Sequence, residues 1–208
     1  MDSNNNYKDF TEKFYEVDKI TDSFRDLQWG SSEGQKIRFQ YLTKLFEEDK
    51  EGEFSLLDVG CGLAHFYDYL SENYFVEKIH YSGLDIQTNF IKFASEKHPK
   101  CKFINKSLFE LETQKKYDYV VASGTFNIVL PDTNMDDYLK QNIKKMYELC
   151  NKGIAFNLLT TNIPSHDMEA INASYNPIDI LKWCFDFTNK VNLYHSYKIN
   201  DFTIAMYK

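Results

Sequence analysis

The chain has 208 residues, of which 43% are hydrophobic and 16% aromatic, and its formal net charge is −7. This apolar content supports one folded domain with a sizeable core and excludes a disordered chain. Because no cluster of Lys and Arg accompanies the acidic balance, and no apolar run is long enough to cross a bilayer, we expect a small-molecule substrate rather than a nucleic acid or a membrane.

The N-terminal part of the chain predicts two amphipathic helices. Apolar residues recur at helical spacing through 7–27. A second helix is predicted after Trp29, where Ser32 and Gln35 have the spacing of a capping box. We expect residues 1–52 to form a helical extension that covers one edge of a ligand site, and residues 53–208 to form the core domain.

Short apolar runs alternate with amphipathic stretches after residue 53. The predicted strands are 54–59, 78–86, 100–105, 117–123 and 153–160. The predicted helices are 65–74, 87–99, 135–153, which ends at Gly153, and 177–188, which Asn176 and Pro177 open. Two closing strands, 191–197 and 201–208, are near enough for a hairpin. This alternation predicts an α/β fold, a Rossmann-like doubly wound sheet of seven strands in three α/β/α layers.

The cysteines and the start of the chain bear on metal binding and location. None of Cys61, Cys101, Cys150 and Cys184 forms a CxxC pair or lies near a His at zinc spacing, so we expect no metal. Their scatter predicts reduced, buried thiols. The polar start, MDSNNNYKDF, lacks the apolar stretch of a signal peptide. We therefore expect a cytoplasmic protein, monomeric or homodimeric.

The segment LLDVGCG, residues 56–62, places a glycine-rich turn between a predicted strand and a predicted helix. Such a turn lets a ligand approach the backbone closely. Asp58 beside it would repel the diphosphate of a dinucleotide but attract the ammonium of S-adenosylmethionine. The third glycine of a GxGxxG motif is also missing, because His65 stands there. The motif therefore favours the methyl donor over a nicotinamide cofactor, and disfavours a dehydrogenase.

A second acid, Asp85 in GLDI, ends the second predicted strand. There it is placed to accept hydrogen bonds from a ribose diol. Nicotinamide dinucleotide sites use an acid at the same place, so Asp85 alone does not discriminate between the two cofactors. Together with Asp58 and an antiparallel last strand, it fits the methyl donor better.

Three segments, LLDVGCG, GLDI and YDYVVASGTFN, together resemble the class I S-adenosylmethionine-dependent methyltransferases over residues 53–208. The leader WGSSEGQKIRF resembles that of a group of small stand-alone bacterial members. The resemblance implies the strand order 3-2-1-4-5-7-6 with strand seven antiparallel. It also implies S-adenosylmethionine as cofactor and S-adenosylhomocysteine as product.

The resemblance also assigns cofactor contacts. The methionine part of the cofactor would contact the turn, here Asp58, Gly60 and Gly62, and the ribose would contact Asp85. Cys61 and Ile86 are further expected cofactor contacts. The family often has an Asp beside the adenine after strand three. Here Ser107 stands about there, and the backbone of Leu108 is the other candidate contact.

Further cofactor candidates lie in the leader and after strand four. Arg38 matches the cofactor carboxylate bidentately, although a solvated surface arginine is an equal reading. Trp29 and Gln35 lie on the same leader, where Trp29 is equally a core anchor. Ser123 and Gly124 follow strand four, where the transferred methyl group should lie.

The catalytic candidates are His65, Asn127 and His166. Asn127 could orient a substrate or merely cap a loop, and His65 or His166 could deprotonate a hydroxyl. A base is not obligatory, because positioning a nucleophile against an activated methyl group can suffice. We expect methylation of an oxygen or nitrogen of a small molecule. The alternative is a non-catalytic partner or regulatory subunit that binds S-adenosylmethionine or S-adenosylhomocysteine.

Overall fold

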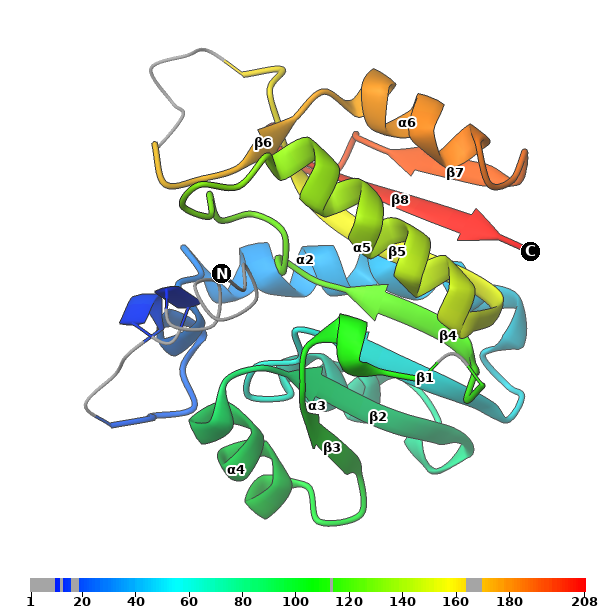
Figure 1. Ribbon diagram of the computed structural model, residues 1–208. Coiled ribbons are helices and arrows are strands. Elements are labelled where there is room, and N and C mark those ends of the chain that lie inside the picture. Colours follow the sequence, from blue (N-terminus) through cyan, green and yellow to red (C-terminus); the bar gives the residue numbers. More distant parts are fainter. Residues whose placement is uncertain (1–9, 12, 16–18, 113, 164–169) are drawn as a thin grey trace.

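The structure, a computed structural model, describes residues 10–11, 13–15, 19–112, 114–163 and 170–208. Its centre is one sheet with the main strand order β3-β2-β1-β4-β5-β8-β7 (Figure 1). The parallel strands are β1 (Phe54–Val59), β2 (Ile79–Asp85), β3 (Lys102–Asn105), β4 (Tyr117–Ala122) and β5 (Cys150–Thr160). Strand β8 (Asp201–Tyr207) runs antiparallel between β5 and β7 (Val191–Tyr194). The predicted order and its antiparallel strand are confirmed.

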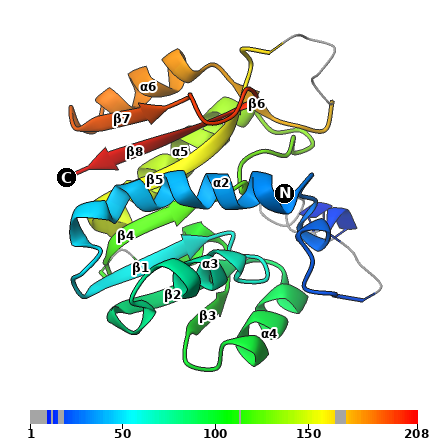
Figure 2. The same ribbon diagram turned by 180° about the vertical axis from the view of Figure 1, so that it is seen from behind.

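Helices cover both faces of the sheet. Figure 1 shows α5 (Met135–Leu149) and α6 (Pro177–Phe185) on one face, and Figure 2 shows α2 (Ser32–Leu42) and α3 (His65–Asn73) on the other. Helix α4 (Thr88–Lys97) connects β2 to β3. The hydrophobic core is correspondingly split into two clusters, one per face, which gives the predicted three layers. No helix in the described part of the chain is long and apolar enough to cross a membrane.

The predicted helical extension shares its core with the sheet. Phe39 and Leu42 of α2, and Phe46 of the following 3-10 helix η2 (Thr43–Asp49), are buried against β1 and α3. Burial of such side chains contributes roughly 1.5–3 kcal/mol each. The packing is thus continuous across residues 52 and 53. The division there into a helical extension and a core domain stays a prediction.

The helix predicted over 7–27 is wrong in its second half. Residues 19–23 are not helical, and only a short 3-10 helix, η1 (Phe24–Leu27), follows. Asp22 has a left-handed φ of 59°, and the Asp26 carboxylate accepts the N–H groups of Thr21 and Ser23 at 2.7 and 3.2 Å. Short polar side chains compete with helical hydrogen bonds in this way, and here they win over the apolar period.

The start of α2 also differs from the prediction by one residue. Ser31, not Ser32, is the N-cap, and its hydroxyl accepts the Gly34 N–H at 2.9 Å. The side chain of Gln35 does not return to the cap, because it contacts His65. The capping box predicted for Ser32 and Gln35 is therefore absent.

The predicted helix stop at Gly153 is wrong as well. Helix α5 ends at Leu149 and β5 begins at once with Cys150, which pairs with Tyr117 of β4. Gly153 lies within the strand, where an added Cβ would be 2.6 Å from the carbonyl oxygen of Met206. The glycine therefore permits the close approach of β8 rather than ending a helix.

One strand was not predicted. Strand β6 (Ser174–Tyr175) pairs in parallel with Leu159 and Thr160 of β5. It lies beyond the point where β4 has ended, because the pairing of β4 with β5 extends only to Phe156. Two residues are too few to carry a period, so no sequence pattern marks this strand.

Candidate functional site

A cavity of about 1350 Å³ opens at the carboxyl ends of the parallel strands. It lies where the sheet order reverses, between β1 and β4, which is the usual ligand position in such sheets. We call it the main cavity. The predicted site residues that line it are Trp29, Arg38, Gly60, Gly62, Asp85, Ile86, Ser107, Leu108, Ser123, Gly124 and Asn127.

Four other predicted residues line a small adjoining cavity: Gln35, Asp58, Cys61 and His65. The two cavities share Leu27, Trp29, Gly60 and Ser123 on their walls. The methionine-side residues of the prediction are thus divided between two neighbouring spaces. His166 lies outside the described residues.

The glycine turn uses its own N–H groups within the protein. Those of Gly60 and Cys61 donate to the Leu84 carbonyl at 2.7 and 3.1 Å. That of Gly62 donates to the Asp85 carboxylate at 2.9 Å. A diphosphate bound at such a turn needs these N–H groups as donors, so the geometry is unfavourable for a dinucleotide.

The leader packs directly on the glycines of the site. A Cβ added at Gly62 would be 2.7 Å from Leu27, and one at Gly124 would be 2.8 Å from the Trp29 ring. Both glycines have left-handed φ values, 52° and 70°. Leu27 and Trp29 therefore form a wall of the main cavity that only glycine would admit at these two positions.

Asp58 lies beneath the turn, with only 1% of its surface exposed. Its carboxylate accepts a hydrogen bond from the Tyr81 hydroxyl at 2.7 Å. Burial raises the pKa of Asp58 to about 7, and the nearby Asp85 acts in the same direction. A cation in the adjoining cavity would favour the ionised form, so the site is poised to gain from a positive ligand.

Asp85 ends β2 and points its carboxylate at two backbone groups. It accepts the N–H groups of Gly62 and Gln87 at 2.9 and 2.8 Å. Burial nevertheless raises the pKa of Asp85 above its usual value. The carboxylate thus braces the turn, and it also lines the main cavity.

Two buried polar atoms beside Asp85 have no hydrogen-bond partner within the described structure. They are Nε2 of Gln87 and Oγ of Ser107, and both side chains line the main cavity. A buried polar atom without a partner costs roughly 1–3 kcal/mol, which a bound polar ligand would recover. Gln87 was not predicted as a site residue, although its place two positions after the acid that ends β2 was an available signal.

Arg38 is engaged with the protein. Its Nε forms an ion pair with the buried Asp201 of β8, and its Nη1 donates to the Gly34 carbonyl at 3.1 Å. The guanidinium also lies over the Trp29 ring at 4.7 Å. These contacts anchor α2 to β8 and favour a structural role over the predicted one, carboxylate binding.

Asn157 of β5 was not predicted as a site residue, yet it holds the end of β4. It is fully buried; its Oδ1 accepts the Gly124 N–H at 2.8 Å, and its Nδ2 donates to Ser123 Oγ at 3.3 Å. Asn127 plays a similar part, because its Oδ1 accepts the Leu159 N–H at 3.2 Å. A polar residue inside the apolar strand GIAFNLLT was the available signal for Asn157.

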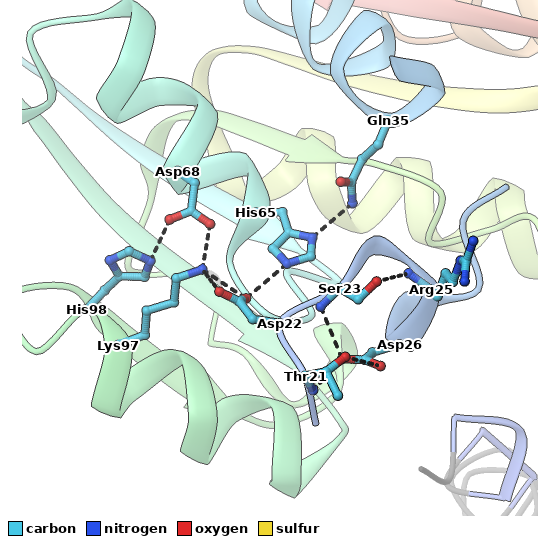
Figure 3. A network of polar contacts seen from close by, with 10 residues as sticks. All are labelled: Thr21, Asp22, Ser23, Arg25, Asp26, Gln35, His65, Asp68, Lys97 and His98. Atoms are coloured by element: carbon cyan, nitrogen blue, oxygen red, sulfur yellow. Dashed lines mark hydrogen bonds and ion pairs between the residues drawn. The ribbon is translucent and has the colours of Figure 1, made fainter. Parts of the chain in front are cut away.

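His65 belongs to a polar network that joins the leader to α3 and α4 (Figure 3). Its Nδ1 is 3.2 Å from Gln35 Nε2, and its Nε2 is 3.1 Å from the Asp22 carboxylate. Asp22 also forms an ion pair with Lys97 at 2.7 Å, and Lys97 contacts Asp68. Both ring nitrogens of His65 thus face protein partners outside the main cavity. This favours a structural role, in which His65 links the leader to α3, over the role of a catalytic base.

Other expectations concern cysteines and metals. All four cysteines are free; Cys61, Cys150 and Cys184 are buried, and Cys101 is half-buried. In the part of the chain that the structure describes, no three His, Cys, Asp or Glu side chains gather as a metal site would require.

Comparison with known proteins relates the sequence to methyltransferases. A family model described as a methyltransferase domain matches residues 57–153. A Mycobacterium tuberculosis protein named as a methyltransferase, without a stated substrate, is 29% identical over 161 residues, which cover 74% of this chain and 93% of that protein. Malonyl-[acyl-carrier protein] O-methyltransferase 2 of Ilyobacter polytropus is 28% identical over 103 residues, 48% of this chain and 39% of that protein.

Solved structures share the fold. The plantazolicin methyltransferase BpumL, in complex with a triazolic desmethylPZN analog and S-adenosylhomocysteine, has a TM-score of 0.70 at 12% identity, covering 98% of this chain and 95% of that one. The magnesium protoporphyrin IX methyltransferase of Synechocystis PCC 6803, with bound S-adenosylhomocysteine, has a TM-score of 0.65 at 13% identity, covering 96% and 93%. The family model and the relatives make the chain similar to methyltransferases, and its fold is the one found in solved S-adenosylmethionine-dependent methyltransferases.

Proposed function

We propose that the protein transfers a methyl group from S-adenosylmethionine to an oxygen or nitrogen of a small-molecule acceptor bound in the main cavity. The observation that carries the proposal is the glycine turn, which directs three successive N–H groups into the protein and has an acid on either side. Such a turn suits a cationic ligand and not a diphosphate. A nicotinamide cofactor is correspondingly disfavoured.

Different residues of the site suit different parts of the cofactor. The unpartnered Gln87 Nε2 and Ser107 Oγ supply polar contacts for its nucleoside beside Asp85, which suits the ribose hydroxyls. Asp58 supplies a carboxylate for its ammonium from below the turn. When bound, the cofactor supplies a methyl group already activated on a sulfonium. The chain itself then needs to bind and orient the acceptor and exclude water.

The acceptor would occupy the half of the main cavity beyond β4. Asn127, Tyr138 and Asn142 line that half, and no histidine stands among the described lining residues. We therefore propose catalysis by positioning, with no histidine base, and His166 stays a prediction outside the described residues. Bacterial relatives and four unpaired cysteines support a bacterial, cytoplasmic protein.

Calorimetric titration with S-adenosylmethionine, S-adenosylhomocysteine and NADH tests the proposal. We expect the first two ligands to bind and NADH not to bind. Asp85→Ala should abolish cofactor binding, whereas Asp179→Ala, which removes a half-exposed acid on α6, should leave it unchanged. Binding of NADH alone, or full cofactor affinity in Asp85→Ala, would overturn the assignment.

A further inference from the structure

Three hydrogen-bond donors, two from α2 and its N-cap and one from the far end of the chain, converge on Gly34 at the wall of the main cavity. A Cβ added at Gly34 would be 2.9 Å from Ser31 Oγ, 3.2 Å from Lys198 Nζ and 3.7 Å from Arg38 Nη1. Ser31, Arg38 and Lys198 all line the main cavity. Lys198 comes from the connection between β7 and β8, so only the folded chain brings the three donors together.

Of the two cationic side chains beside Gly34, Arg38 has a carboxylate partner among the described residues and Lys198 does not. The carboxylate of Asp201 is fully used, because one oxygen pairs with Arg38 and the other accepts the Tyr197 hydroxyl at 2.6 Å. The ammonium of Lys198 has no hydrogen bond or ion pair within the described structure. Lys198 therefore adds a positive charge at the cavity wall; the charge of Asp201 acts on it as well, but that carboxylate is already paired with Arg38.

The position of Lys198 is fixed by its neighbours. The Asn200 carbonyl accepts the Thr160 N–H at 3.2 Å, which ties this connection to the carboxyl end of β5. Lys198 is half-buried, and burial, together with the charge of Arg38, lowers its pKa, while the charge of Asp201 opposes the shift without cancelling it. An anion beside it would relieve both effects. Ser31 already accepts a hydrogen bond from Gly34, and its hydroxyl keeps a proton to donate.

We propose that Lys198, assisted by the Ser31 hydroxyl, binds a carboxylate in the main cavity. The proposal rests on the proposed function, which offers two sources of that group. One is an acceptor that carries a carboxylate, and the other is the methionine carboxylate of the cofactor. A charge-assisted hydrogen bond of this kind contributes about ten- to a hundredfold in affinity.

The test compares Lys198→Met with Lys36→Met and Lys198→Arg. Lys36 is exposed on α2, the helix that carries Gly34 and Arg38, and does not line the main cavity, so it controls for the loss of a nearby charge. Lys198→Arg keeps the cation and should restore most of the affinity. Thermal unfolding followed by circular dichroism shows whether each variant is folded before binding is compared.

Two titrations separate the sources of the carboxylate. In the first, S-adenosylhomocysteine is compared with 5′-methylthioadenosine, which lacks the amino acid end. If the cofactor supplies the carboxylate, Lys198→Met loses tenfold or more for the former ligand only. In the second, a panel of monocarboxylic acids and their primary amides is titrated into protein saturated with S-adenosylhomocysteine. If the acceptor supplies it, wild type prefers an acid over its amide at least tenfold, and Lys198→Met loses that preference alone.

The proposal is overturned if Lys198→Met keeps the full affinity for S-adenosylhomocysteine and wild type prefers no acid over its amide. The same holds if Lys36→Met has the same effect as Lys198→Met. Failure of the proposed function is a different result, in which wild type does not bind S-adenosylhomocysteine. The acid and amide titrations are then made on the free protein, and a preference that depends on Lys198 leaves the carboxylate site standing.

Discussion

Replacement of Asp58 by asparagine should change how the stability of the protein depends on pH. The buried carboxyl has a pKa of about 7 in the folded protein, against 3.8 for an ordinary aspartate. Between these values the folded state keeps a proton that the unfolded state has released. The contribution of Asp58 to stability therefore falls as the pH rises from 4 to 7 and is constant above that window. At 1.36 kcal/mol per pKa unit, the full loss is about 4 kcal/mol.

Asp58→Asn removes this titration. Its free energy of unfolding relative to wild type should increase by about 4 kcal/mol between pH 4 and pH 8. An offset of about 1–3 kcal/mol from the unpaired amide N–H group is the same at every pH and drops out of the comparison. Urea unfolding at pH 4, 6 and 8 measures the effect. Asp179→Asn, on the half-exposed side chain of α6, is the control and should follow wild type.

The affinity for the cofactor should change with pH in the opposite direction to the stability contribution of Asp58. Affinity of the wild type for S-adenosylmethionine should rise as the pH passes through 7, because an ionised Asp58 attracts the ammonium. In Asp58→Asn this rise should be absent, and affinity at pH 8 should be lower than in wild type. Parallel stability curves for the two proteins from pH 4 to 8 would refute the reasoning about Asp58.

Two further substitutions test the frame of the site. Gly60→Ala should lower the free energy of unfolding by about 2–5 kcal/mol, because φ is +70° and the new Cβ would lie 2.5 Å from Thr125 Oγ1. In a Thr125→Ala background, only the part of this loss that comes from the steric clash should be recovered. A loss below 0.5 kcal/mol would contradict the prediction. Asn157→Ala should lower the free energy of unfolding by about 2–3 kcal/mol and weaken S-adenosylhomocysteine binding, because it leaves the buried Gly124 N–H and Ser123 hydroxyl without their partner. Denaturant unfolding measures the first effect and calorimetry the second. Unchanged affinity would show that Asn157 does not support the cofactor site.

The elements with a clear apolar pattern were predictable, and each exception has a specific physical cause. Strand β1 was predicted at its observed bounds, since a six-residue, mainly apolar run, interrupted only by Ser55 and Asp58, indicates a buried strand. The helix over 7–27 was wrong because the polar caps around Asp22 and Asp26 override the period. The stop at Gly153 was wrong because pairing with β8, far away in sequence, decides where that glycine lies.

The site was predictable where it is made of strand ends and turns. Asp85, Gly60 and Gly124 follow strands whose carboxyl ends share an edge, so their convergence follows from the sheet order. Arg38 and Lys198 were not predictable in this way. The pairing of Arg38 with Asp201, and the place of Lys198 beside Gly34, depend on contacts between α2 and the far end of the chain.

The position of β8 has a consequence for synthesis. Strand β8 is made after β7 but is not an edge strand, because it is inserted between β5 and β7, with Phe202, Ile204 and Met206 at or below 1% exposure. Until residues 201–207 emerge, β7 has no neighbour to pair with, and Arg38 lacks the carboxylate that neutralises it. A nascent chain can therefore assemble β1 to β5 early, whereas the cavity wall around Gly34 is completed only after β8 has been synthesised.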